Sequence, residues 1–219
     1  MPHSDDTSFP VSETSRIRRY HERGSHERQA VYAVLDASPI CHVGYVIEDQ
    51  PYVTPTLHWR LGDRIFWHGS SASRFLKQTR EHKVCLTVTL IDGFVLARSA
   101  FNHSVNYRSA MVFGVAHQLT DPAEKEASLK AMTEDFYPGR WDKLRPITAQ
   151  EIKATAVLYM DIAEASVKVR SGPPGDQAEA DFPVWAGLVP LQTILSDPRV
   201  DGDPDHPLPV LSARLGAKT

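Results

Sequence analysis

"CHVGYVIEDQPYVTPTLHWRLGDRIFWHG" (residues 41–69) decides the fold of this chain. Apolar and polar residues alternate in three short runs, and the connections "EDQP" and "RLGD" contain residues that favour turns. Alternation with a period of two places one side of each run in a core and the other side nearer solvent. The pattern therefore predicts three consecutive antiparallel strands joined by tight turns.

The second of these runs contains a proline, Pro55, which has no backbone N–H to donate to a neighbouring strand. Its position predicts a strand edge or a bulge. Thr54, Thr56 and His58 share one face of this strand, because side chains alternate along it.

Further strand patterns follow, and helices interrupt them rarely. The strands are expected in residues 83–101, 107–119 and 154–172, and the helices in 25–37, 71–82 and 121–136. The chain contains neither GxGxxG nor GxxxxGK, and its elements do not alternate regularly between strand and helix. We therefore expect a mainly β fold with flanking helices, built as an antiparallel barrel.

The composition is that of an ordinary globular protein, with 42% hydrophobic and 23% charged residues among 219. We expect a flexible N-terminal arm (residues 1–24), one domain (25–190) and an irregular C-terminal tail (191–219). A net charge of −3 gives no reason to expect nucleic acid or a membrane surface as a partner. Cys41 and Cys85 lie in apolar runs, which favours reduced thiols and a cytoplasmic location. The histidines of "HERGSHER" are five residues apart and do not share a helix face, so no metal site is expected.

The junction "FWHGSSASRFL" (residues 66–76) concentrates hydrogen-bond donors where a strand gives way to a helix. One interpretation is a serine-capped helix with Arg74 in solvent. The other is an anion site, in which backbone N–H groups, serine hydroxyls and Arg74 hold a phosphate. The helix dipole disfavours a cation in the first turn, so a plain cap would more naturally carry an acidic residue there.

Three longer segments add a family resemblance: "PYVTPTLHW…RIFWHGSSASRFL", "NYRSAMVFGVAHQLTDPAEKEASLKAMTEDFYPGR" and "RPITAQEIKATAVLYMDI". They resemble the flavin-binding split-barrel superfamily of pyridoxamine 5'-phosphate oxidase, and more narrowly its 5-nitroimidazole-resistance branch. The likeness extends from about Arg28 to Pro190. It implies a six-stranded antiparallel split β-barrel and a homodimer with FMN at the subunit interface.

The resemblance also implies which residues contact the cofactor. The phosphate would be held at the junction, by Ser70, Ser71, Ser73 and Arg74. The flavin ring would lie along two strands, near Thr54, Thr56, Leu57, Thr87 and Thr89. Further contacts are expected from Asn106, Lys168 and Trp185, and His68 matches a histidine near the flavin that we take as the candidate catalytic residue.

The function that the resemblance implies is an FMN-dependent oxidoreductase that moves hydride or electrons through flavin N5. The donor and the acceptor would be small molecules, the acceptor a nitroaromatic or a quinone. Two alternatives remain open: a flavin carrier or sensor without turnover, and a haem-binding split barrel with an axial ligand among His42, His58, His68 and His103. No segment closely matches the arginine-containing "RLAP" segment of the oxidase, so oxidation of vitamin B6 does not follow from the resemblance.

Overall fold

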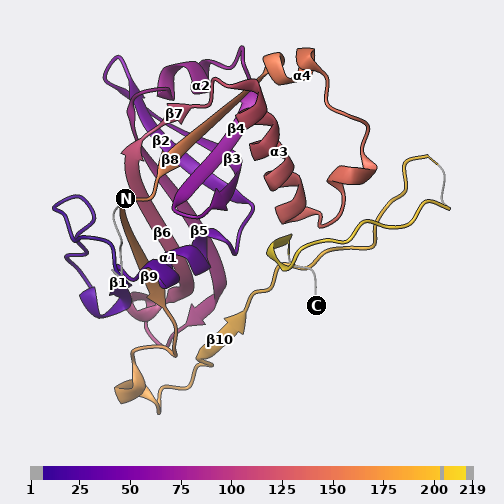
Figure 1. Cartoon of the computed structure of the whole chain (residues 1–219). Helices are drawn as coiled ribbons and strands as arrows, with labels where there is room; N and C mark the ends of the chain where they lie inside the picture. The colour runs from indigo at the N-terminus through magenta and orange to yellow at the C-terminus, as the bar shows by residue number, and fades with distance from the viewer. Residues whose placement is uncertain (1–6, 203–204, 216–219) are drawn as a thin grey trace.

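The computed structural model describes residues 7–202 and 205–215, which form an antiparallel β-barrel with helices at its ends and a projecting C-terminal segment (Figure 1). The strands are β1 (Gly24–Ser25), β2 (Ile40–Ile47), β3 (Gln50–Leu61), β4 (Arg64–Ser70), β5 (Lys83–Leu96), β6 (Ser104–Val115), β7 (His117–Gln118), β8 (Thr155–Asp161), β9 (Glu164–Arg170) and β10 (Gly187–Pro190). The helices are α1 (Arg28–Leu35), α2 (Arg74–Thr79), α3 (Pro122–Phe136) and α4 (Ala149–Ala154). Short 3-10 turns cover His21–Arg23, Ala100–Asn102, Trp141–Lys143, Gln177–Glu179 and Ala213–Leu215.

The barrel is closed by one bent strand. The strand order is β1-β9-β6-β5-β2-β3-β4-β8-β7, and β10 pairs with β5. Only Ile162 and Ala163 separate β8 from β9, yet β8 pairs with β4 whereas β9 pairs with β6. β8 and β9 therefore act as a single strand whose two halves join opposite edges of the sheet. Counted this way, β2 to β6 and β8–β9 form the expected six-stranded antiparallel split barrel.

The barrel splits along β3, which changes its neighbour in the middle. Residues Gln50–Leu57 of β3 pair with β2, and residues His58–Leu61 pair with β4. Pro55 lies opposite His42 in the part that has β2 as its only paired neighbour, so the expected local edge is confirmed. On β4, residues 68–70 keep β8 as a partner on one side and have no paired β3 residue on the other.

Two apolar clusters lie on the two faces of this sheet. The barrel interior is filled by fully buried side chains that include Trp67, Leu86, Val112 and Met160. The second cluster lies between the outer face of β3, β4 and β8 and the covering segment of α3 and α4, and contains Trp59, Phe66, Phe136, Ile152 and Val157. Within the described residues, no helix is long and apolar enough to cross a membrane.

Two helices begin as the sequence predicts. The Asp121 carboxylate accepts hydrogen bonds from the backbone N–H groups of Ala123 (2.7 Å) and Glu124 (3.1 Å) at the start of α3. At the start of α4, Thr148 and Glu151 form a reciprocal capping box.

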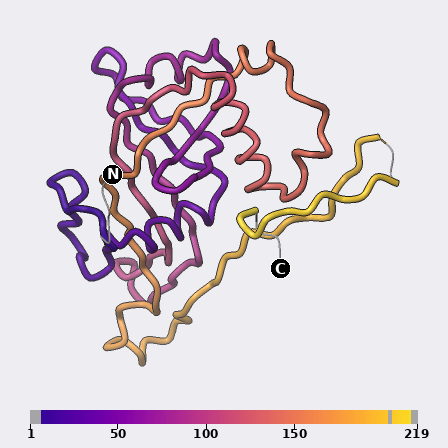
Figure 2. The backbone as a smooth tube through the Cα atoms, in the orientation of Figure 1, coloured from indigo at the N-terminus to yellow at the C-terminus, as the bar shows by residue number. Residues whose placement is uncertain are grey.

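The N-terminal segment packs against the barrel over the residues that are described. The side chain of Phe9 is only 2% exposed and belongs to the barrel core, and Gly24 pairs with Lys168 of β9. Figure 2 shows this segment beside β9. The expected flexible arm therefore has an anchored portion from residue 7, because one phenylalanine in a polar segment finds an apolar site. Residues 1–6 of the expected arm lie outside the described residues.

The described part of the C-terminal segment is anchored by Arg214. One Nη atom of Arg214 donates to the carbonyls of His58 (2.8 Å) and Ser38 (3.0 Å), and the other donates to Asp135 (2.6 Å). Its guanidinium also lies over the ring of Phe136, with the centroid at 4.9 Å. Residues 191–202 and 205–213 thus belong to a segment held by β10 at one end and by Arg214 at the other, and Figure 1 shows these residues projecting from the barrel.

We predict that Arg214→Ala lowers the free energy of unfolding by about 2–3 kcal/mol, because it removes a charged donor with several buried acceptors. The tail should also become an easier target for limited proteolysis, since one of its two anchors is lost. Urea unfolding measures the first effect. Arg199→Ala, a change at an exposed position in the same tail, is the matched control and should leave the midpoint unchanged. Equal midpoints for the two variants would contradict the role of Arg214.

Candidate functional site

The junction between β4 and α2 is held by backbone hydrogen bonds. The N–H of Ser71 donates to the carbonyl of Ala154 at the end of α4 (2.8 Å), and the N–H of Ser73 donates to the carbonyl of Ser70 (2.9 Å). The Ser70 hydroxyl accepts from the N–H of Ala72 (3.2 Å). These bonds fix the turn without using the hydroxyls of Ser71 and Ser73.

The junction does not form a side-chain-capped helix. Ser73 is the N-cap residue of α2, but its side chain makes no capping hydrogen bond. Arg74 is exposed and contacts the ring of Tyr52, 5.7 Å from the ring centroid, and no carboxylate of the described residues pairs with it. The junction therefore presents hydroxyl groups and an uncompensated cation, which suits an anionic ligand.

Thr54, which is predicted to contact the flavin, lies close to the Arg74 cation. The hydroxyl of Thr54 is 3.1 Å from that of Tyr45, and Tyr45 stacks on Tyr52 with ring centroids 5.5 Å apart. Arg74 and Thr54 are thus linked through two tyrosines, and Thr56 follows on the same face of β3. The structure brings these two predicted residues together with the junction.

The same tyrosines line a cavity of about 850 Å³ beside the junction. Its other walls are formed by β2, β5 and β6, and include Gly44, Cys85 and Phe113. The Cys85 thiol is half buried, and burial raises its pKa, so it is a neutral thiol at pH 7. Tyr45 and Tyr52 thus give the cavity aromatic walls, and Lys83 and Glu164 add one charge of each sign, whereas Arg74 contacts Tyr52 without lining the cavity.

Thr87 and Thr89 lie on the opposite face of the sheet from Thr54. The register places Thr54 beside Val43, and Val43 beside the buried Leu86. Thr87 and Thr89 alternate with the inward side chains of β5 and therefore face outward. Within one chain the two groups of threonines do not converge.

His68 carries a buried nitrogen that lacks a partner. Its Nδ1 atom has no hydrogen bond with any described residue, and its ring packs edge-on against Trp59 with centroids 5.7 Å apart. Burial lowers the pKa of the imidazole, which is therefore neutral at pH 7. The residue lies where the β3–β4 pairing has just ended, next in register to Leu57. A buried polar atom without a partner costs about 1–3 kcal/mol, and a ligand group beside His68 would satisfy its nitrogen. The Nδ1 atom of His58 and the indole nitrogen of Trp59 are also buried without a partner among the described residues.

The other three candidate histidines are less suited to a ligand. His58 is fully buried, and its Nε2 is engaged with the carbonyl of Leu35 (2.9 Å). Burial, with a smaller contribution from the charge of Arg214, lowers the pKa of His58 to about 3. The Nδ1 of His103 is 2.9 Å from the carbonyl of Ser99, and His42 is exposed on the outer face of β2.

Three predicted contacts lie away from the junction. Asn106 is bound within its own chain, accepting from Arg170 and donating to the carbonyl of Gly172 (3.2 Å). The ammonium of Lys168 donates to the carbonyl of Arg19 (2.9 Å). Trp185, just before β10, is 63% exposed. These contacts to a cofactor stay predictions.

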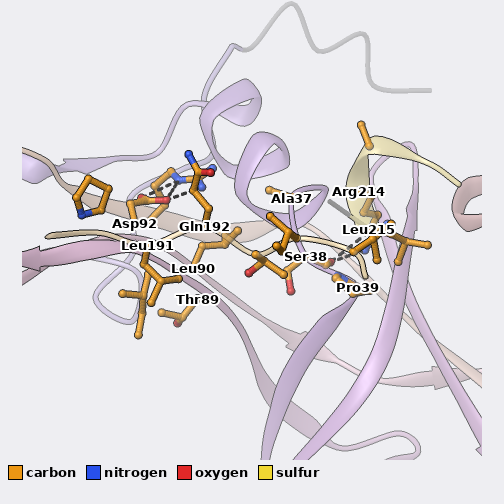
Figure 3. Close-up of a pocket in the computed structure, with 17 residues that line it drawn as sticks. Ala37, Ser38, Pro39, Thr89, Leu90, Asp92, Leu191, Gln192, Arg214 and Leu215 are labelled. Carbon is orange, nitrogen blue, oxygen red and sulfur yellow. Dashed lines mark hydrogen bonds and ion pairs between the residues drawn. The ribbon is translucent and has the colours of Figure 1, made fainter. Parts of the chain in front are cut away.

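A second cavity, of about 1020 Å³, lies between β5 and the C-terminal loop (Figure 3). Thr89 is part of its wall, and Asp92 forms a two-pronged ion pair with Arg108 (2.7 and 3.0 Å) at one end. The sequence analysis missed Asp92, although "DG" inside a strand signals a bulge and the β5–β6 register does shift there. Gly93 is required beside it, because a Cβ atom would lie 2.8 Å from the carbonyl oxygen of Val189.

The chain is similar to known proteins in both sequence and fold. The family profile described as pyridoxamine 5'-phosphate oxidase matches residues 27–169. The structure of flavocytochrome Anf3 from Azotobacter vinelandii is 43% identical, with a TM-score of 0.86, and the match covers 94% of this chain and 96% of that one. The FAD and haem binding protein from Mycobacterium smegmatis is 35% identical, with a TM-score of 0.81, over 85% of this chain and 94% of that one.

A candidate 5-nitroimidazole antibiotic resistance protein from Bacteroides thetaiotaomicron shares the fold. It is 20% identical over 67% of this chain and 86% of that one, with a TM-score of 0.55. A search of curated proteins found no significant match.

We predict that His68→Leu stabilises the ligand-free protein by about 1 kcal/mol, because an apolar side chain removes the unpaired buried nitrogen. The free energy of unfolding in urea, measured on protein stripped of bound small molecules, gives the value. His21→Leu is the control, since His21 is 85% exposed and should leave stability unchanged. A clear loss of stability in His68→Leu would show that the nitrogen is satisfied within the chain.

Proposed function

The chain belongs to the pyridoxamine 5'-phosphate oxidase family, and on this basis we propose that it is an oxidoreductase that binds a flavin nucleotide and a haem. The observation that carries the proposal is the segment from His68 to Arg74, which supplies a neutral histidine with a buried free nitrogen, unengaged hydroxyls and an unpaired cation. Two relatives support it, because the Azotobacter protein is a flavocytochrome and the Mycobacterium protein is described as binding both FAD and haem.

The donor set at the junction fits a flavin nucleotide. Arg74, Ser71 and Ser73 would hold a phosphate, through one charged and two neutral donors. Thr54 and Thr56 would hydrogen-bond the polar edge of the ring. A flavin supplies hydride and single-electron chemistry, while the protein supplies position and a water-poor surrounding.

The haem would be held by His68. A neutral imidazole is the form that ligates iron, and the lowered pKa keeps His68 in that form at pH 7. The neighbouring ring of Trp59 offers an apolar surface that excludes water from the histidine. In the alternative without haem, the same nitrogen would donate or accept a proton beside the flavin.

FMN is the flavin that the sequence predicts, and FAD is the flavin named for the Mycobacterium relative. Both carry the same ring and a phosphate at the same distance from it, so the junction serves either. The open cavity beside Tyr45 and Tyr52 leaves room for the additional nucleotide of FAD. Extraction of the bound flavin and measurement of its mass distinguish the two.

The test of function is the visible absorption spectrum of the purified protein, which should show flavin bands and a haem Soret band. Arg74→Ala should weaken flavin binding by about 2 kcal/mol, roughly 30-fold, because a charged hydrogen-bonding partner is lost. Lys77→Ala, an exposed change on the same helix, should leave flavin affinity unchanged.

His68→Leu should abolish the Soret band and retain the flavin bands. A protein that binds neither cofactor after reconstitution would overturn the proposal. Steady-state reduction of a quinone or a nitroaromatic by reduced nicotinamide then separates an enzyme from a flavin carrier or sensor.

The outward threonines lie on a face that would suit a homodimer. The outer face of β2, β3, β5 and β6 exposes apolar side chains, among them Ile40 (42%), Val53 (68%) and Met111 (41%), beside Thr87 and Thr89. Exposed apolar surface of this kind is typical of an interface. We propose that two copies pair through this face, so that the junction of one and the outward threonines of the other enclose one flavin. The electron acceptor would be a small molecule.

Val53→Asp should convert the dimer to a monomer and release the flavin, because it buries a charge in the proposed interface. The monomer fold should tolerate it, since Val53 is 68% exposed. Sedimentation velocity with absorbance detection at flavin wavelengths measures both effects. Val200→Asp, at an exposed position in the tail, should change neither. A monomer that retains its flavin would refute the shared site.

A further inference from the structure

The N-terminal segment builds a positively charged surface on a chain whose net charge is −3. We define this basic surface as residues 13–23 together with Lys168. It contains five cations and two carboxylates, and the cations are Arg16, Arg18, Arg19, Arg23 and Lys168. Its formal charge is therefore +3, opposite in sign to that of the whole chain.

Tyr20 gathers three of these cations around one ring. The guanidinium of Arg23 lies 4.2 Å from the ring centroid, that of Arg19 lies 5.6 Å from it, and the ammonium of Lys168 also lies 5.6 Å from it. Tyr20 adopts a left-handed backbone conformation (φ 54°), which costs a non-glycine residue about 1–2 kcal/mol. An unfavourable backbone conformation and repulsion between like charges thus occur at the same place on the surface.

The carboxylates at this surface leave it positive. Glu13 lies 3.2 Å from Arg16 and 2.7 Å from Arg18, so one negative charge is shared between two guanidinium groups. Glu22 lies 3.7 Å from Arg23. An approaching anionic surface would relieve the remaining repulsion between the cations.

The basic surface lies beside the strands that carry the outward threonines. Lys168 of β9 pairs with Ser109 of β6, and Ser109 pairs with Thr89 of β5. Strands are about 4.8 Å apart, so Lys168 and Thr89 are separated by about 10 Å. A partner seated on the basic surface would therefore be close to the side of the barrel where we propose that the flavin lies.

We infer that this surface docks an acidic electron-carrier protein that supplies the reducing electrons; the inference rests on the proposed oxidoreductase function. The cations come from two separate segments, which form a broad contact suited to a protein surface rather than to one phosphate. The association is electrostatic, so it is fast at low ionic strength and weakens as salt screens the charges.

The test uses an acidic plant-type [2Fe–2S] ferredoxin as the probe, with the full-length protein as purified. Binding is measured by biolayer interferometry at ionic strengths of about 0.01 M and about 0.15 M, which span the range over which surface charges become screened. We expect binding at low ionic strength that weakens at least tenfold at the higher value. Arg18→Glu with Arg19→Glu, two exposed changes, should weaken binding at low ionic strength at least tenfold.

The matched control carries the same charge change elsewhere, as Lys143→Glu with Arg199→Glu, and should bind like the unmodified protein. Equal binding of the two double variants would overturn the inference, and so would binding to duplex DNA or anionic vesicles but not to ferredoxin. The flavin absorbance of each sample separates the two proposals. If the protein holds no flavin and still binds ferredoxin, only the proposed flavin binding is contradicted. If the protein holds flavin and does not bind ferredoxin, only the proposed docking on the basic surface is contradicted.

Discussion

Closure of the barrel by β8–β9 is the constraint on which the rest of the structure depends. A buried strand must find a hydrogen-bond partner for each backbone N–H and C=O group, and an open sheet leaves two edges unpaired. One strand, bent at Ile162 and Ala163, forms backbone hydrogen bonds with β4 through its first half and with β6 through its second half. β4 is thereby paired along its whole length on one side, while β3 can follow it for only four residues on the other. The split at Leu57 and His68 is a consequence of that geometry.

The split leaves the first part of β3 without β4 as a partner. Close to it, the buried Nδ1 atom of His68 has no partner among the described residues, and Arg74 pairs with no carboxylate of these residues. Such groups lower the stability of a ligand-free protein and are typical of binding sites. The chain belongs to the pyridoxamine 5'-phosphate oxidase family, and His68 and the junction are where we propose that a haem and a flavin are held.

Both ends of the described chain are tied to the barrel, the N-terminal segment by Phe9 and by the pairing of β1 with β9, and the tail by Arg214 and Ser212. Phe9 fills a site in the barrel core, and Arg214 joins the tail to α1, β3 and α3 through carbonyls and a carboxylate. Neither residue belongs to a periodic pattern, so their roles could not be recognised from their neighbours in sequence. The same anchoring places the basic surface beside β9 and forms one wall of the cavity next to Asp92.

The local elements can be predicted from the sequence, because side-chain period, turn residues and helix caps act within a few positions. Alternation around Thr54 and Trp67 predicts strands, Asp121 and Thr148 predict helix starts, and the order of the motifs predicts the split-barrel family. The pairing of the strands is known from the folded structure alone, and it places Thr54 and Thr87 on opposite sides of the sheet. The folded structure also shows that His68 lies at an unpaired strand end and that Arg214 meets the carbonyl of His58. These facts depend on hydrogen bonds between residues far apart in the chain, which form only when the barrel closes and which no local pattern encodes.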